Sequence, residues 1–263
     1  MCAHRRLDKL GRTLLMATAG VMAAGLLAAN LAAQNFVISQ NGKSVGTAKL
    51  SVKQGDGSLD SASETKIDMP GLKYTFSSNV DLDGSYHIRS VKLDGSVNGT
   101  AATVTAQPRG QEIDLRIDAN GKKIDTPLAF HPSTIFYPDF DPGALQALLN
   151  LGAAHNNRDL WALVPKQSGS VAALRVVTNA DMQGTLDGKT VAVHHFTVTG
   201  DTGKTEVFSD PSNALLQAEW TDEGFAMVRK GFKLTPPARP NAAPPAAPPQ
   251  QPTGNDNQPQ NQP

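Results

Sequence analysis

The feature that most constrains this chain is an alternation of apolar and polar residues with a period of two. The clearest run is Glu112 to Asp118, where Ile113, Leu115 and Ile117 alternate with charged residues. Similar runs cover 48–52, 72–76, 80–82 and 86–88. Because successive side chains of a strand point to opposite faces, the pattern predicts strands with one buried face and one wet face, as in antiparallel sheet.

Turn dipeptides separate these runs. Asn and Asp followed by Gly accept the positive φ angles that tight hairpin turns require. The pairs are Asn41-Gly42, Asp56-Gly57, Asp83-Gly84, Asp94-Gly95, Asn98-Gly99, Asn120-Gly121 and Asp187-Gly188. This density of turn signals favours an up-and-down meander over a repeat of β-α-β units.

One helix is expected to interrupt the strands, at about 141–151. Asp141 suits the N-cap, Pro142 suits the first helical position, and Leu145, Leu148 and Leu149 form an apolar stripe. A helix this short is expected to lie across a sheet face or an open barrel end. Strands resume at 160–164, 171–177, 191–199, 204–208, 215–220 and 225–234.

The stretch NGKSVG, Asn41 to Gly46, fits three patterns at once. It contains the G-x-S-x-G of a nucleophile elbow, the Gly-Lys-Ser that ends a phosphate loop, and an Asn-Gly turn. An elbow requires a helix after Ser44, but an alternating strand follows instead. A phosphate loop requires a glycine where Val37 stands. We therefore interpret the stretch as a hairpin turn, and a hydrolase that uses Ser44 is the less favoured alternative.

The first 33 residues have the parts of a secretory signal. Arg5, Arg6, Lys9 and Arg12 precede an apolar run from Leu14 to Ala33. The run is also close to the length of about 20 residues that spans a bilayer. We expect cleavage near Ala33, with an uncleaved N-terminal anchor as the alternative. Both place the folded part in the periplasm or outside the cell, and membrane contact is expected only through this segment if it is not cleaved.

The other end of the chain is rich in proline. Residues 236–263 contain Pro, Ala, Gln and Asn and no aromatic residue. Such a segment cannot bury enough apolar surface to offset its ordering entropy, so it is expected to be an extended, solvated tail. The expected organisation is a signal or anchor at 1–33, one β-rich domain at 34–235, and a disordered tail at 236–263.

Charge and cysteine content narrow the function classes. Four of the 24 basic residues and one of the 24 acidic residues lie in the first 33, which leaves the remainder with a net charge near −3. A chain with this balance is not expected to bind nucleic acid or anionic lipid head groups strongly. Cys2 is the only cysteine, so the exported part has no disulfide and no thiol nucleophile.

The sequence gives weak signals for metals, cofactors and catalysis. His194 and His195 are adjacent in an expected strand and point to opposite faces, so they cannot chelate one metal together. Asp139 and Asp141 resemble the carboxylate pair of glycosidases, but Asp141 has a simpler role as an N-cap. No catalytic residue, metal site or cofactor is assigned, and we expect a protein that is not an enzyme.

The richest aromatic cluster, Ile135 to Phe140, lies just before the expected helix. It either fills the core where the two strand-rich halves meet or forms a lip over an apolar cavity. Trp220 belongs with it: Leu216, Ala218 and Trp220 are expected to share one strand face that packs against the helix. The residues assigned to a ligand site are Phe136, Tyr137, Phe140, Leu145, Leu149 and Trp220.

Two stretches resemble known families. GKSVGTAKLSV, from Gly42 to Val52, resembles the opening hairpin of exported bacterial domains of unknown function of the DUF3108 and DUF6134 class. TEVFSDPSNALLQAEWTDEGFAMVRKGFKL, from Thr205 to Leu234, resembles the closing strands of that class and of LolA-like lipoprotein carriers. The resemblance implies an open antiparallel β half-barrel around a helix, and in the LolA-like carriers that concavity holds acyl chains.

Together these observations give a leading hypothesis and two rivals. The leading one is an exported, non-enzymatic domain that binds an apolar ligand, such as a lipid, or an envelope protein in its half-barrel. The first rival is a structural or interaction domain with a packed core and no ligand. The second is the hydrolase that uses Ser44 or the Asp139/Asp141 pair.

Overall fold

The structure is a computed structural model that describes residues 30–55, 57–155, 159–166, 169–201 and 203–236. The expected signal segment and the expected tail lie outside these residues, apart from 30–33 and residue 236. Within the described part, no helix combines the length and the apolar character needed to cross a membrane.

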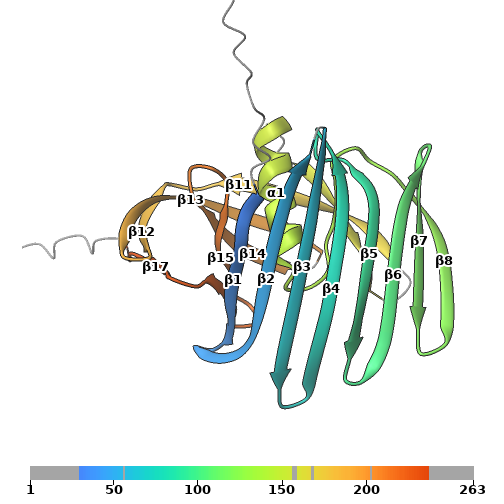
Figure 1. The fold of residues 1–263 in the computed structure, drawn as a ribbon, viewed down its shortest axis with the longest axis horizontal. Helices are drawn as coiled ribbons and strands as arrows, with labels where there is room; N and C mark the ends of the chain where they lie inside the picture. Colours follow the sequence, from blue (N-terminus) through green and yellow to red (C-terminus); the bar gives the residue numbers. More distant parts are fainter. Residues whose placement is uncertain (1–29, 56, 156–158, 167–168, 202, 237–263) are drawn as a thin grey trace, which may run out of the picture.

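Strands make up most of the described chain, as expected, and α1 (Pro142–His155) is the helix that interrupts them (Figure 1). The helix continues four residues beyond the expected end at 151. The strands are β1 (Asn30–Gln40), β2 (Lys43–Gly55), β3 (Ser58–Met69), β4 (Leu72–Asp83), β5 (Ile88–Val97), β6 (Thr100–Arg109), β7 (Glu112–Ala119), β8 (Lys122–Ala129), β9 (Thr134–Phe136), β10 (Asp159–Val164), β11 (Ser170–Thr178), β12 (Met182–Leu186), β13 (Lys189–Gly200), β14 (Gly203–Ser209), β15 (Leu215–Trp220), β16 (Phe225–Arg229) and β17 (Phe232–Leu234).

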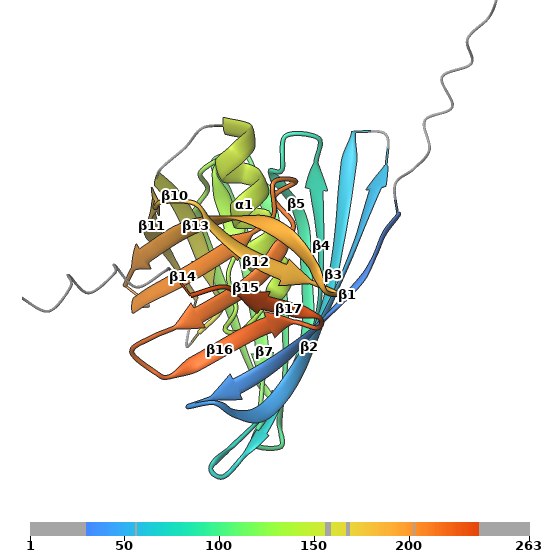
Figure 2. The same ribbon diagram turned by 90° about the vertical axis from the view of Figure 1, so that its left-hand side faces the viewer.

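The strands form one large, open sheet. Its hydrogen-bonded order is β8-β7-β6-β5-β4-β3-β2-β1-β16-β15-β14-β13-β11-β10-β9. Neighbours are antiparallel except β9 and β10, which are parallel. β12 pairs with β13 and with β17 beside this order (Figure 2). The sheet is thus an open half-barrel, as expected, because among the described strands β8 pairs with β7 and β9 pairs with β10, and no register joins β8 to β9.

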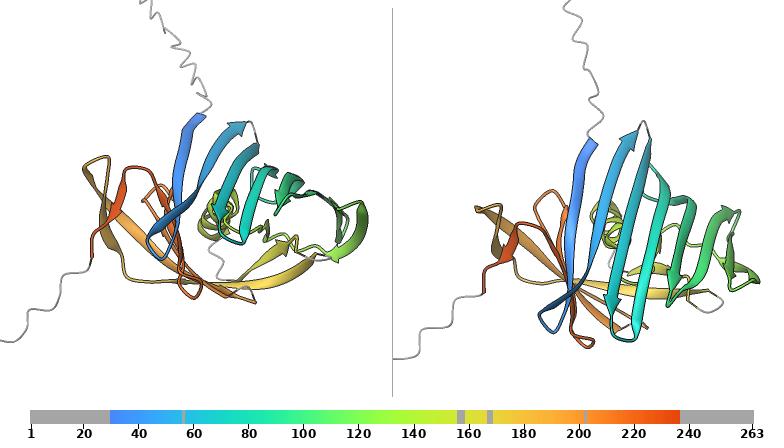
Figure 3. Two further views of the ribbon diagram at one scale, coloured as in Figure 1. Left: turned by 90° about the horizontal axis from the view of Figure 1, so that it is seen from below. Right: turned by 60° about the horizontal axis from the view of Figure 1, so that its bottom comes forward.

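The sheet curves around α1. Seen from below, the strands form an incomplete ring with the helix inside it (Figure 3). Every residue of α1 from Pro142 to Leu149 is buried, and only Gln146 among them carries a polar side chain. A helix that is apolar on all sides must be enclosed by other elements, so α1 fills the concave side of the half-barrel and does not merely lie across one face.

Four turn pairs adopt the expected geometry, with both residues at positive φ. They are Asn41-Gly42, Asn98-Gly99, Asn120-Gly121 and Asp187-Gly188. The NGKSVG stretch is therefore the turn of the β1–β2 hairpin, as expected. The expected turn at Asp94-Gly95 is wrong, because both residues lie inside β5. A Cβ at Gly95 would lie 2.5 Å from the Thr75 carbonyl oxygen, so only a residue without a side chain lets β4 and β5 approach this closely.

A bulge in β15 overturns the expected common face of Leu216, Ala218 and Trp220. Phe208 pairs with Gln217, but Ser209 pairs with Leu215, so Leu216 is skipped in the register. Leu215 and Ala218 consequently join the main core, whereas Leu216 packs on the other side of the sheet with Val193, Phe208 and Phe232. A single inserted residue reverses the facing of the residues before it, which the period-two pattern does not reveal.

Trp220 keeps its expected inward facing. It is half-buried, packs against the main core, and contacts Phe140 edge-on with ring centroids 4.9 Å apart. Full burial of a large side chain makes its truncation cost about 3–5 kcal/mol, and partial exposure lowers that cost. We therefore expect Trp220→Ala to reduce the free energy of unfolding by about 2–3 kcal/mol.

Urea denaturation measures this loss. Ser44→Ala is the control, because Ser44 is exposed at the start of β2 and its substitution is expected to change stability by no more than about 0.5 kcal/mol. Equal stability of Trp220→Ala and the parent would contradict a core role for this side chain.

Candidate functional site

The six residues assigned to a ligand site lie in one cluster around the N-terminal half of α1. Phe136 ends β9, Leu145 and Leu149 lie on the helix, and Trp220 ends β15. Tyr137 and Phe140 belong to the connection between β9 and α1, residues 137–141, which we call the plug. All six belong to or pack against the main core. Apart from half-buried Trp220, they are at most 8% exposed.

Phe140 is the centre of the aromatic contacts. Its ring meets Trp220, and it also meets Phe225 of β16 with centroids 4.7 Å apart. Its backbone has a φ of 55°, in the left-handed region that a bulky residue rarely adopts. The Thr65 hydroxyl donates a hydrogen bond of 2.8 Å to the Phe140 carbonyl. Packing and this hydrogen bond together hold a backbone conformation that costs about 1–3 kcal/mol.

Asp141 caps α1 from a fully buried position. Its Oδ1 accepts a hydrogen bond of 2.8 Å from the Gly143 amide. Burial raises the pKa of Asp141 to about 6, although hydrogen bonds from the Ser63 hydroxyl and from the amides of Gly143 and Ala144 act in the opposite direction. The sequence predicted the cap, but not that β3 would supply a hydroxyl to it.

The inward face of β3 explains how a carboxyl group can be held there. Ser61, Ser63 and Thr65 are spaced by two, are all buried, and form a polar stripe within an apolar sheet face. Gly143 allows the helix to approach this stripe, because a Cβ there would lie 3.1 Å from the Ser61 hydroxyl oxygen. The start of the helix is thus joined to β3 by polar contacts.

A small pocket opens beside the start of α1, and we call it the α1 pocket. Its volume is about 30 Å³. It is lined by Tyr137, Pro138, Asp139, Phe140, Asp141, Leu145, Lys166, Trp220 and Glu223. Four of the six predicted ligand residues therefore line one pocket, while Phe136 and Leu149 do not line it.

Polar groups surround this pocket. Lys166 Nζ lies 2.9 Å from Asp139 Oδ2 in a partly exposed ion pair. Burial raises the pKa of Tyr137 to about 12, although its hydrogen bond with Thr205 lowers this pKa. Burial also raises the pKa of Tyr74, whose hydroxyl donates to the Asp139 carbonyl at 3.4 Å, and the nearby Asp139 and Asp141 add to this effect. Both phenols therefore stay protonated at neutral pH.

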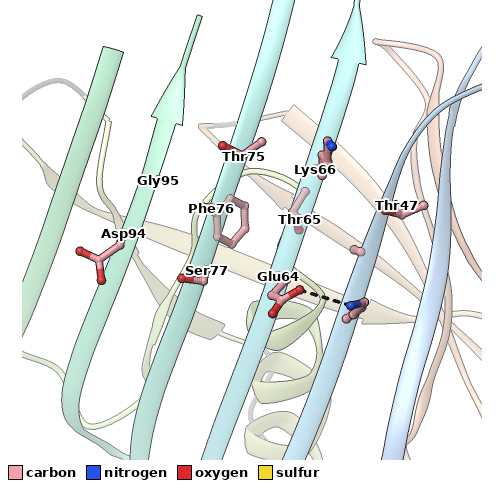
Figure 4. Close-up of a pocket in the computed structure, with 11 residues that line it drawn as sticks. Thr47, Glu64, Thr65, Lys66, Thr75, Phe76, Ser77, Asp94 and Gly95 are labelled. Carbon is pink, nitrogen blue, oxygen red and sulfur yellow. Dashed lines mark ion pairs between the residues drawn. The ribbon is translucent and has the colours of Figure 1, made fainter. Parts of the chain in front are cut away.

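Larger hollows lie on the outer face of the sheet, away from the predicted residues. One of about 400 Å³ crosses β2 to β5, with α1 behind the sheet (Figure 4). It is lined by Thr47, Ala48, Lys49, Glu64, Thr65, Lys66, Thr75, Phe76, Ser77, Asp94 and Gly95. Its Lys49–Glu64 ion pair, at 3.5 Å, joins side chains more than 60% exposed. Exposed pairs of mixed sign typify a solvated sheet face, so we do not take this hollow as the site.

Residues 36–230 match the model of DUF6134, a domain of unknown function. The chain belongs to the DUF6134 family. The match spans β1 to β16 and includes the whole α1 pocket. The resemblances to DUF3108 domains and to LolA-like carriers stay expectations.

The other comparisons give no information about the function of this DUF6134 chain. A search of curated proteins gives no match. A crystal structure of a DUF1089 family protein from Pseudomonas aeruginosa aligns with a TM-score of 0.37 and 9% sequence identity. The alignment covers 64% of this chain and 87% of that chain. A similarity this low transfers no property.

The chemistry available in the described residues is limited. No group of three or more His, Cys, Asp or Glu side chains there is arranged to hold a metal ion. The two carboxylates of the expected alternative pair have other partners: Asp139 forms an ion pair with Lys166, and Asp141 is the buried cap of α1. The arrangement around α1 combines aromatic and aliphatic side chains with four charged ones, those of Asp139, Asp141, Lys166 and Glu223.

The raised pKa of Asp141 predicts a specific pH dependence of stability. The folded protein favours the protonated carboxyl, so this contribution to stability is fully present below the unfolded pKa of 3.8 and is lost as the pH rises through about 6. A shift of this size corresponds to about 3 kcal/mol. We expect Asp141→Asn, which still caps but cannot ionise, to exceed the parent in stability at pH 7 and to lose that advantage by pH 4.

Urea denaturation at pH 4, 5.5 and 7 checks this. Asp141→Ala serves as the matched variant, because it also cannot ionise but lacks the cap, so it should be about 1 kcal/mol less stable than Asp141→Asn at every pH. A difference between parent and Asp141→Asn that does not change with pH would refute the assignment.

Proposed function

We propose that this protein is a non-enzymatic binding protein of the cell envelope that takes an apolar ligand at the α1 pocket. The observation that carries the proposal is the lining of that pocket. Tyr137, Phe140, Leu145 and Trp220 form its apolar wall, and they are continuous with the core inside the half-barrel. A ligand entering here would meet this apolar wall together with four charged side chains, those of Asp139, Asp141, Lys166 and Glu223, so the pocket suits a ligand that has both an apolar and a polar part.

The size of the α1 pocket requires movement of the plug. Ligand pockets typically measure about 300–1,000 Å³, far more than the 30 Å³ found here. The plug is the segment suited to move. It follows β9, whose three residues pair only with β10 among the described strands, and Phe140 stores backbone strain that displacement would release. Withdrawal of the Phe140 ring would enlarge the α1 pocket by the volume that the ring now fills against Trp220 and Phe225.

The rival function, a packed interaction domain without a ligand, also has an observation in its favour. α1 fills the concave side of the sheet, and the predicted ligand residues other than Trp220 are almost wholly buried. A domain of this kind would bind partners only through its outer surface. Ligand titration separates the two functions, because a packed domain does not respond to apolar probes.

The chain contains two tryptophans, so Trp161→Phe leaves Trp220 as the fluorescent reporter of the pocket. We expect butanol, pentanol and hexanol to change Trp220 emission saturably. Each added CH₂ should tighten binding about fourfold, the equivalent of about 0.8 kcal/mol. The control is Trp220→Phe, in which Trp161, stacked on His131, should not respond. Unsaturable changes, or affinities independent of chain length, would favour the packed domain.

The proposed location is tested separately. It rests on the basic and apolar parts of residues 1–33, and it does not depend on the ligand. N-terminal sequencing of the protein from fractionated cells is expected to give a start near Gln34 in the exported fraction. An intact N-terminus in the membrane fraction would support the anchor instead, and recovery from the cytoplasm would contradict both.

A further inference from the structure

We propose that the α1 pocket recognises a primary ammonium group, so that the apolar ligand is an amphiphile with an amine head. This inference rests on the proposed function, because it names the head group of the same ligand. It comes from four features of the pocket: its charge, its aromatic wall, its size, and the lysine ammonium already beside it.

The charge of the pocket favours a cation. Its lining includes the carboxyl groups of Asp139, Asp141 and Glu223 but only one basic side chain, Lys166. Lys166 pairs with Asp139, which leaves Glu223 without an ion-pair partner among the described residues. The rim formed by Asp139, Lys166 and Glu223 therefore carries a net charge of −1, and ionisation of buried Asp141 would add to it.

The wall of the pocket favours the same kind of group. Trp220, Phe140 and Tyr137 all line it, and aromatic faces attract cations through their quadrupoles, with tryptophan the strongest. This attraction is stronger when the cation is desolvated, as it would be inside a pocket. Aromatic rings combined with carboxylates select an ammonium group over a neutral or an anionic group of the same size.

The volume of the pocket restricts which ammonium group fits. A space of 30 Å³ is about two to three times the 10–15 Å³ that one water molecule requires, so it holds only a small group. A primary ammonium group is of that size, whereas a trimethylammonium group is much larger. The head group enters the existing space, and the tail requires the plug movement proposed above.

Lys166 already places such a group at the rim. Its ammonium lies 2.9 Å from Asp139 Oδ2, yet its side chain is 56% exposed. Exposed ion pairs contribute little to stability, so a ligand can displace this lysine at little cost. We infer that Lys166 pairs with the Asp139 carboxylate when no ligand is bound. The ammonium head group of the ligand then competes with Lys166 for this carboxylate.

Three probes of equal chain length test the inference in the Trp161→Phe background: hexylamine, hexanol and hexanoate. Hexylamine is protonated at pH 7, as a lysine side chain is. We expect it to bind at least about tenfold more tightly than hexanol, equivalent to about 1.4 kcal/mol. Hexanoate should bind more weakly than hexanol, because it meets the negative rim.

Substitutions at the rim test whether its charged side chains cause the preference for hexylamine over hexanol. Glu223→Gln should lower hexylamine affinity and leave hexanol affinity unchanged. Lys166→Ala should raise hexylamine affinity, because it removes the competitor for Asp139. Glu64→Gln is the matched control, since Glu64 is exposed on the outer face of β3, away from the pocket, and should change neither affinity.

The outcomes separate this inference from the proposed function. Equal binding of hexylamine and hexanol would overturn the ammonium head group and leave the apolar site standing. Tightest binding of hexanoate, lost in Lys166→Ala, would overturn it in favour of an anionic head group. Failure of all three probes to bind saturably would overturn the proposed function itself.

Discussion

The burial of α1 is the constraint on which the rest of the structure depends. A helix that is apolar on every side cannot face water, and the sheet encloses it by curving from β8 to β9 (Figure 3). The helix then closes the concave side that the open sheet would otherwise expose. Gln146 is the polar exception inside this arrangement. Its amide accepts from the Leu215 backbone at 3.0 Å and donates to the Asn213 carbonyl at 2.8 Å, which ties the middle of α1 to the start of β15.

The N-terminus of α1 adds a polar joint to this apolar enclosure. Its first amides need acceptors, and burial removes water as the supplier. Asp141 provides the acceptor, but its own charge is then costly to bury, which is why its pKa rises despite three hydrogen bonds. The Ser/Thr stripe of β3 lowers that cost, and Thr65 extends the joint to the carbonyl of Phe140. Helix capping and the strained backbone of the plug are therefore parts of one hydrogen-bonded connection to β3.

Local patterns in the sequence predicted most strands and the helix. They could not predict register irregularities or contacts between segments that are far apart in the chain. The alternation around Ile113, Leu115 and Ile117 correctly gave their burial, because each strand there continues without a bulge. The same rule failed at Leu216, where one unpaired residue reverses the facing, and a turn signal failed at Gly95, where glycine serves strand contact. The aromatic cluster was assigned to the site from its position just before the helix, and Trp220 from a strand face expected to pack against that helix. Lys166 and Glu223 were missed, because nothing local shows that segments so far apart in the chain share a pocket rim.

Two opposing energies meet in the plug at Phe140. Glycine at position 140 would avoid the cost of the left-handed backbone but would make no aromatic contact. The chain instead has phenylalanine there, and accepts the strain in return for contact with Trp220 and Phe225. The energy of those aromatic contacts and the strain of the backbone oppose each other at a single residue. Under the proposed function, a ligand that replaced the ring of Phe140 against Trp220 would recover the contact and release the strain. Opening here would then cost less than opening elsewhere in the core, where removal of a side chain offers no such return.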